Sequence, residues 1–251
     1  MFKTLKILKH QGKQFIPDLS NVTLPAIHAG MPEISGIACK EGCNVCAEVC
    51  PVNAIAIAPV TIDLAKCVFC VECQNECSEK KINFTSSYKI ASNDPELLKV
   101  SDNKTIEWNP DKVRSEIKRV FGRSLKLRLV SDGSCNGCEL ELNAADNVNF
   151  DMSRYGIEFV ASPRHADGVV ITGALVENSV KALELTFEAI PQPKVVILCG
   201  ACALSGGIFA GSPALNRSFI EKYKPDLYLP GCPPHPLTII DGIMRLTGRS
   251  K

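Results

Sequence analysis

Two cysteine-rich runs decide the fold of the N-terminal part of this chain. Residues 39–51 read CKEGCNVCAEVCP, and residues 67–77 read CVFCVECQNEC. Three closely spaced thiolates can ligate three irons of a cubic iron–sulfur cluster, whereas the fourth cysteine of such a run ligates the other cluster of a pair. The two runs therefore predict a small unit, residues 36–90, that holds two 4Fe–4S clusters and depends on them for stability.

Each predicted cluster takes three ligands from one run and its fourth ligand from the other run. A single zinc ion is the alternative, but zinc sites usually combine separated cysteine pairs around one tetrahedral ion. The first cluster is expected to bind Cys39, Cys43, Cys46 and Cys77, and the second to bind Cys67, Cys70, Cys73 and Cys50.

From Cys39 to about Phe84, this stretch resembles bacterial two-cluster ferredoxins, including the segment CPVNAI at residues 50–55. It departs from them in two places. Three residues instead of two separate Cys39 from Cys43, and a serine instead of proline follows Cys77. We expect a bulged turn at Gly42 to absorb the additional residue. Without that turn, the first cluster would be labile or would contain three irons.

Composition excludes several other classes of protein. The 28 Lys and Arg residues against 27 Asp and Glu residues give a net charge of +1, which argues against a nucleic-acid-binding protein. The N-terminus has no secretory signal, so 13 cysteines indicate metal binding rather than disulfides. Residues 195–216 carry no charge but contain several glycines, and predict a buried strand and a tight loop rather than a membrane helix.

Residues 125–251 alternate between strand and helix signals. This alternation predicts an α/β domain with a flavodoxin-like, doubly wound parallel sheet. Strands are expected at residues 125–130, 157–161, 168–172, 194–198 and 226–229, and helices at 138–148, 176–190, 213–224 and 235–247.

Two further segments complete the expected domain organisation. Residues 1–35 form an arm that begins with a short basic amphipathic helix and is irregular over 18–35. Such a helix lies on a membrane surface, docks on a partner or remains solvated. Residues 91–124 form a linker that ends in an amphipathic helix, with Asn109 as its N-cap and Gly122 at its C-terminal end.

The remaining cysteines follow three different predicted strands. Parallel strands present their carboxyl ends at one edge of the sheet, where open α/β folds bind ligands. Glycines accompany these cysteines and allow the backbone to approach a cluster closely. A third 4Fe–4S cluster is therefore expected among Cys135, Cys138, Cys199, Cys202 and Cys232, with Cys202 favoured over Cys199 because it lies further into its loop.

Residues 112–248 resemble the small subunit of energy-converting nickel–iron hydrogenases of the formate hydrogenlyase and Ech types. The motifs are CNGCE at 135–139, GAC before SGG at 200–207, PGCPP at 230–234 and SPRHAD at 162–167. The resemblance implies that Cys135, Cys138, Cys202 and Cys232 ligate the proximal cluster and that Cys199 is spare. The related 20 kDa-type subunit of complex I typically has two adjacent cysteines where this chain has a separated pair, which favours the hydrogenase side.

This resemblance implies an electron-transfer subunit that relays electrons through three 4Fe–4S clusters. The electrons pass to or from a nickel–iron site in a separate large subunit, where protons are reduced or hydrogen is oxidised. The chain itself then has no catalytic residues. Expected partners are the large subunit, membrane subunits and a donor such as ferredoxin, a formate dehydrogenase or a carbon monoxide dehydrogenase. The chain is expected in the cytoplasm, held at the membrane by partners. A complex I-like quinone oxidoreductase subunit and a free-standing ferredoxin remain alternatives.

Four other side chains are candidates for supporting roles. Glu139 follows a predicted ligand and serves either as a proton relay or as a charge that stabilises a helix N-terminus. Arg164 and His165 follow a predicted strand, and we expect them on the side of the third cluster or at a partner interface. His235 lies three residues after Cys232 and is expected near that cluster.

Overall fold

The computed structural model describes residues 2–12, 14–102 and 104–249. Its C-terminal part contains a five-stranded sheet in the order β10-β9-β8-β6-β7, in which every pairing is parallel. In chain order this is 2-1-3-4-5, the flavodoxin-like arrangement. The predicted fold class is therefore confirmed. The strands are β6 (Leu125–Ser131), β7 (Ile157–Phe159), β8 (Gly168–Thr172), β9 (Val195–Cys199) and β10 (Leu227–Leu229).

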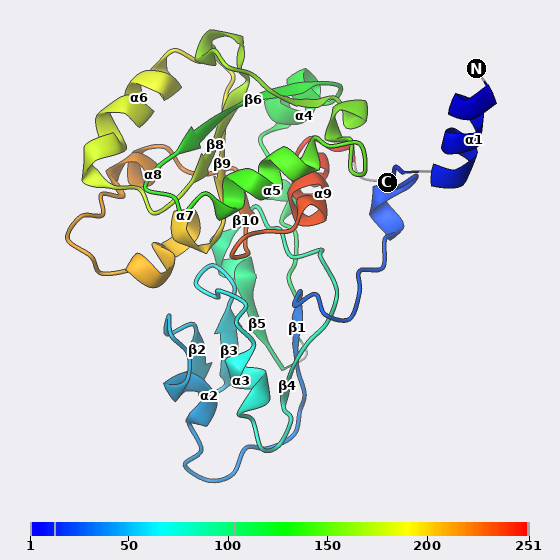
Figure 1. Cartoon of the computed structure of the whole chain (residues 1–251). Coiled ribbons are helices and arrows are strands. Elements are labelled where there is room, and N and C mark those ends of the chain that lie inside the picture. Colours follow the sequence, from blue (N-terminus) through cyan, green and yellow to red (C-terminus); the bar gives the residue numbers. More distant parts are fainter. Residues whose placement is uncertain (1, 13, 103, 250–251) are drawn as a thin grey trace.

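Helices cover both faces of this sheet (Figure 1). Alternate residues of the strands point to opposite faces, so Val170 and Ile197 join one core while Ile171 and Leu198 join the other. The first core packs against α4 (Ser115–Phe121), α5 (Gly137–Ala145) and α9 (Pro236–Leu246). The second packs against α6 (Val180–Glu188), α7 (Ala201–Ser205) and α8 (Ser218–Lys222).

The cysteine-rich part lies below the large sheet in Figure 1 and is built from short antiparallel strands. One sheet has the order β2-β3-β5, and the other pairs β1 with β4. One one-turn helix lies within each cysteine run. The elements are β1 (Pro32–Ile34), α2 (Val45–Glu48), β2 (Ile55–Ile57), β3 (Val60–Asp63), α3 (Glu72–Asn75), β4 (Ile82–Phe84) and β5 (Lys99–Ser101).

Strands β1 and β5 lie outside the range predicted for the ferredoxin unit, yet they pair with its strands. The expectation that residues 18–35 are irregular is therefore wrong for β1. Within residues 36–90, β2 pairs with β3, while β4 and β3 satisfy further backbone groups by pairing with β1 and β5 outside that range. The segment after the unit is also packed, since Ser92 bridges Tyr228 of β10. The predicted division into domains stays a prediction.

Two predicted helices differ from the structure. Asn109 caps only a short 3₁₀ turn, because Val113 and Arg114 are extended and the α-helix begins at Ser115. The Arg114 side chain instead reaches Asp226. The helix expected over 213–224 is reduced to α8, and the tight loop expected after β9 contains the one-turn helix α7.

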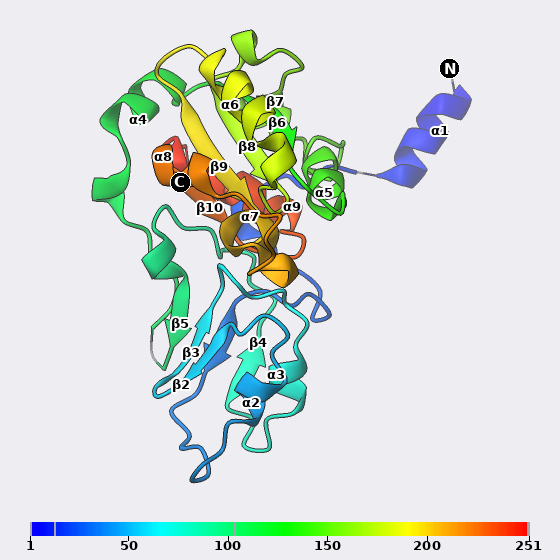
Figure 2. The same cartoon turned by 90° about the vertical axis from the view of Figure 1, so that its left-hand side faces the viewer.

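The N-terminal helix α1 (Phe2–Gln11) projects away from the rest of the chain in both views (Figures 1 and 2). No side chain within Phe2–Gln11 is buried. The helix expected from the sequence is confirmed. Among the described residues, no helix has the length and apolar character needed to cross a membrane.

Candidate functional site

The first cysteine set comprises Cys39, Cys43, Cys46 and Cys77, which line one cavity of about 100 Å³. Cys46 lies on α2, and Cys77 arrives from the end of the second run, so residues far apart in sequence meet here. Gly42 adopts a left-handed conformation with φ of 71°, which permits the expected turn between Cys39 and Cys43. The backbone N–H of Lys81 donates to Cys77 Sγ over 3.3 Å.

The second cysteine set comprises Cys50, Cys67, Cys70 and Cys73, which line a separate cavity of about 20 Å³ beside apolar residues such as Ile62 and Phe84. Two backbone amides donate to its sulfurs, from Ala54 to Cys50 over 3.2 Å and from Phe69 to Cys67 over 3.3 Å. Hydrogen bonds of this kind stabilise a thiolate and tune the reduction potential of a bound cluster.

Burial opposes ionisation of several of these thiols. It raises the pKa of Cys67 to about 12 and that of Cys73 to about 11. It also raises the pKa of Cys46 in the first set. Iron bound at these sets would have to displace the thiol protons, because the thiolate is the ligand.

The third cysteine set comprises Cys135, Cys138, Cys202 and Cys232. Cys135 and Cys138 lie at the start of α5 after β6, Cys202 lies on α7 after β9, and Cys232 follows β10. All three strands are parallel, so the set gathers at their carboxyl edge, as the sequence predicted. Burial raises the pKa of Cys202 to about 11, and the neighbouring thiols Cys232, Cys138 and Cys135 act in the same direction.

Glycines line the backbone next to this set. A Cβ at Gly200 would lie 2.4 Å from Cys138 Sγ, and one at Gly207 would lie 3.0 Å from Cys202 Sγ. These distances are shorter than van der Waals contact, so larger residues would displace the sulfurs. Glycine at both positions therefore lets the backbone lie against the sulfurs of this set, and the expected close approach to a cluster stays a prediction.

Cys199 differs from the other cysteines of the C-terminal part. It is the last residue of β9, is fully buried and belongs to the apolar core beneath α5 and α9. Its thiol forms a hydrogen bond with Cys138, which lowers the pKa of Cys138 and raises that of Cys199. Cys199 thus supports a member of the third set from the core side.

Glu139 is buried, and both of its carboxylate oxygens accept hydrogen bonds. It accepts hydrogen bonds from Ser134 Oγ over 2.7 Å and from Thr172 Oγ1 over 2.6 Å. Burial alone would raise its pKa, but the hydroxyl donors outweigh burial and lower it. A carboxylate held ionised in this way stabilises the first turn of α5. The local sequence does not identify either hydroxyl as a donor to Glu139, because the packing of β8 and of the loop before α5 brings these hydroxyls to the carboxylate.

His235 caps α9, where its Nδ1 accepts a hydrogen bond from the N–H of Leu237 over 3.1 Å. Its ring packs edge-on against His28, 5.1 Å between centroids, and against Phe150. Burial lowers the pKa of His235 to about 4, so the ring is neutral at pH 7. His28 carried no recognisable signal in the sequence, since it is 207 positions away from His235.

Arg164 and His165 are exposed and lie at the opposite edge of the sheet from the third set. They precede β8, and the nearby Asp167 accepts a hydrogen bond from the N–H of Lys126 near the start of β6. Strand β6 is seven residues long, which separates the two edges by roughly 20 Å. Of the two expected positions, the cluster side is wrong, because β7 is short and the loop after it lies at the amino edge. A position at a partner interface stays a prediction.

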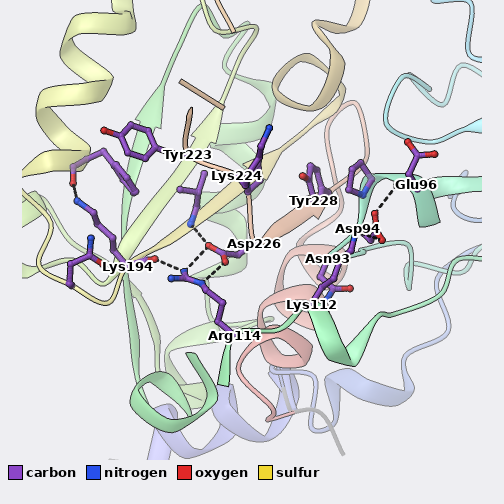
Figure 3. Close-up of a pocket in the computed structure, with 15 residues that line it drawn as sticks. Asn93, Asp94, Glu96, Lys112, Arg114, Lys194, Tyr223, Lys224, Asp226 and Tyr228 are labelled. Atoms are coloured by element: carbon purple, nitrogen blue, oxygen red, sulfur yellow. Dashed lines mark hydrogen bonds and ion pairs between the residues drawn. The ribbon is translucent and has the colours of Figure 1, made fainter. Parts of the chain in front are cut away.

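A cavity of about 660 Å³ lies away from the cysteines, and Figure 3 shows the residues that line it. Lys194 and Asp226, which precede β9 and β10, place it at the amino edge of the sheet. Its charged groups are largely paired with one another. Arg114 donates to both carboxylate oxygens of Asp226, and Lys112 pairs with Asp94 over 2.6 Å. This cavity is therefore distinct from the predicted cluster sites.

The donor chemistry of the three sets fits iron–sulfur clusters. Among the described residues, no three His, Cys, Asp or Glu side chains converge closely enough to hold one metal ion. In a 4Fe–4S cluster each thiolate binds a different iron, so the sulfurs surround a volume instead of meeting at a point. The first and second sets each line a cavity, so their side chains surround a volume in this way. The assignment of individual ligands stays a prediction.

A match to a known protein family covers much of the C-terminal part of the chain. Residues 135–246 match the family described as NADH ubiquinone oxidoreductase, 20 kDa subunit. A probable membrane-bound hydrogenase subunit of Pyrococcus furiosus is 38% identical over 130 residues, which cover 52% of this chain and 78% of that protein.

Two further relatives come from different complexes. Formate hydrogenlyase subunit 7 of Escherichia coli is 34% identical over 57% of this chain and 56% of its own length. A subunit of the NADH-quinone oxidoreductase of Geotalea daltonii is 39% identical over 43% of this chain and 64% of its own length. With the third cysteine set inside the matched range, this chain belongs to the family of the 20 kDa subunit of NADH ubiquinone oxidoreductase.

Proposed function

We propose that this chain is the electron-transfer subunit of a membrane-associated nickel–iron hydrogenase complex, an oxidoreductase. The observation that carries the proposal is the gathering of twelve cysteines into three sets, two around cavities of the ferredoxin unit and one at the carboxyl edge of the parallel sheet. Three 4Fe–4S clusters bound there would each accept and donate one electron.

The chain's own residues would hold these groups and control their surroundings. The twelve thiolates would be the ligands, and the amides of Ala54, Phe69 and Lys81 would stabilise negative charge on sulfur. Apolar side chains such as Ile62 and Ile82 would exclude water from the inner walls of the cavities. Water exclusion strengthens each of these hydrogen bonds electrostatically.

Partially open sites would allow exchange of electrons with partners. Each set includes at least one exposed cysteine, namely Cys39, Cys70, Cys135 and Cys232. Exposed apolar side chains follow two members of the third set, Leu140 after Cys138 and Ile208 after Cys202. Exposed apolar groups near the third set support docking of a large subunit that carries nickel and iron.

The N-terminal helix supports a location at the membrane surface, in contact with partner subunits on the cytoplasmic side. Its sequence FKTLKILKHQ contains basic residues but no acid, and Phe2, Leu5 and Leu8 are exposed. A basic helix with an exposed apolar face binds anionic membrane surfaces or an acidic partner. Deletion of residues 1–14 should release the chain from membrane fractions while its iron content is unchanged.

A complex I-like quinone oxidoreductase subunit is the second candidate, favoured by the family description and by the Geotalea daltonii relative. The separated pair Cys135 and Cys138 favours the hydrogenase. The two functions differ in one metal, since only the hydrogenase complex contains nickel. The physiological donor, such as ferredoxin, a formate dehydrogenase or a carbon monoxide dehydrogenase, is a further part of the proposal.

The decisive experiment is anaerobic affinity purification of the tagged chain from gently solubilised membranes, with iron and nickel counted per chain. The proposal predicts nickel near one and iron slightly above twelve, together with a co-purifying large subunit. Iron near twelve without nickel, with quinone reduction, would instead support the complex I-like function. Iron well below twelve would contradict the three-cluster assignment in both.

A further inference from the structure

The side chain of Lys81 is buried beside the first cysteine set, where a charged group is unexpected. The residue is 5% exposed and lines the same cavity as Cys39, Cys43, Cys46 and Cys77. Its Nζ donates to the carbonyl oxygens of Ser35 over 2.6 Å and Ile37 over 2.8 Å, and pairs with Asp102 Oδ2 over 3.1 Å. An ammonium group is tolerated in such a position only when it is paired in this way.

Lys81 also connects both ends of the first cysteine set through its backbone. Its N–H donates to Cys77 Sγ, and its carbonyl oxygen accepts from the N–H of Ser35 over 2.9 Å. Ser35 begins the segment that leads to Cys39. One residue therefore links the cysteine contributed by the second run to the loop that carries the first cysteine of the set.

The loop that carries Cys39 has few other attachments. Residues 36–40 are largely exposed and belong to no helix or strand. Within the described part of the chain, the other hydrogen bonds and ion pairs of this loop are a turn from Lys40 to Cys43 and the surface interactions of Lys40 with Ser78 and Glu79. Surface ion pairs of this kind add little stability. The two carbonyl contacts of the buried Lys81 ammonium are therefore the main restraint on the approach to Cys39.

We propose that Lys81 is a positioning residue for the first cluster, and this inference rests on the proposed function because it requires that cluster. The ammonium group holds the loop so that the wider spacing between Cys39 and Cys43 still presents both sulfurs to one cavity. It also places a positive charge beside the site. Since the reduced cluster is more negative than the oxidised one, this charge raises the reduction potential.

The test compares four variants of the full chain, purified anaerobically, by iron content and by EPR-monitored redox titration. Lys81→Met removes the buried charge, and Asp102→Asn removes its partner. The double variant removes both, and Lys80→Met is the matched control because Lys80 is an exposed neighbour. Iron content and potential are readouts that do not depend on turnover by a partner subunit.

We expect one of the three titrating centres to shift in Lys81→Met by about tenfold in its reduction equilibrium, about 59 mV to lower potential for a one-electron couple, or to be lost with about four irons. Asp102→Asn should shift the same centre to higher potential, and the double variant should lie between the two. Lys80→Met should match the wild type.

Full iron content with unshifted potentials in both Lys81→Met and Asp102→Asn would overturn the inference. If Lys81→Met does not fold, the upward shift in Asp102→Asn remains the test, and its absence would overturn the electrostatic role. A wild-type chain that itself lacks the first cluster would refute the proposed function instead, so the two failures are distinguishable.

Discussion

Replacement of Gly200 by alanine tests the construction of the third cysteine set most directly. Gly200 joins β9 to α7, with φ of 93° and ψ of 153°, a conformation that residues with a side chain rarely adopt. An added Cβ would lie 2.4 Å from Cys138 Sγ, and 3.7 Å and 3.8 Å from atoms of Gly231 and Pro234. The new methyl group is therefore confined on several sides and cannot avoid the sulfur.

Two costs add in this variant. The backbone conformation costs about 1–3 kcal/mol for a residue other than glycine. The forced contact with the sulfur costs about 1–3 kcal/mol more, as for other overpacked sites. The sum is about 2–6 kcal/mol, and each kcal/mol lowers Tm by about 2–4 °C in a chain of this size. Displacement of Cys138 should also remove the third cluster, so we expect a loss of about four irons per chain.

Gly211→Ala is the matched control. Gly211 has φ of 83°, but no heavy atom lies within 4 Å of an added Cβ. It therefore carries a backbone cost without the contact with sulfur, and its iron content should equal that of the wild type. The measurements are Tm and iron per chain. Equal iron content and equal Tm in Gly200→Ala and Gly211→Ala would refute the proposed packing of Gly200 against Cys138.

Three further predictions concern other parts of the chain. Cys232→Ala should remove the third cluster and spare the other two, whereas Cys199→Ala should keep all irons because Cys199 lies in the core. EPR and iron analysis distinguish the two variants. A loss of about four irons from Cys199→Ala would show that Cys199 is a ligand of the third cluster. Thr172→Val removes one of the two hydroxyl donors to buried Glu139 and should lower the free energy of unfolding by about 1.5–3 kcal/mol in denaturant titration. Thr61→Val, which removes an exposed hydroxyl, should change the free energy of unfolding by less than about 0.5 kcal/mol. Equal changes in the two variants would contradict the role of this hydrogen bond. A chain lacking residues 1–14 should unfold at the wild-type Tm, because α1 buries no side chain. It should bind anionic vesicles more weakly in a sedimentation assay. Unchanged binding would mean that α1 is a solvated helix without a role at the membrane.

Local patterns in the sequence were sufficient for much of the fold. Buried β8, predicted at residues 168–172, was found with those bounds, because a continuous apolar run between turn residues has few alternatives to a central strand. The helix over 213–224 was predicted too long. Its first residues include Pro213 and bridge toward Val176 through Leu215, so a long-range contact prevailed over local propensity.

Local sequence patterns did not predict which distant strands pair with one another. Strand β1 pairs with β4 across about fifty residues, and β5 completes the sheet of β2 and β3. Short strands carry weak signals because their stability comes from the neighbouring strand and not from their own residues. Local sequence likewise did not predict the burial of Lys81, which follows from its contacts with Ser35 and Asp102 on other segments.

The sequence by itself predicted the grouping of the cysteines, since their spacing along a few turns of chain indicates which thiols can face one cavity. It also determined the alternation of strands and helices that places Cys135, Cys138, Cys202 and Cys232 at one edge of a sheet. Only the tertiary structure decided which groups support those cysteines. Burial of Cys199, the hydroxyl donors of Glu139 and the amino-edge position of His165 depend on packing between distant segments, which spacing along the chain does not encode.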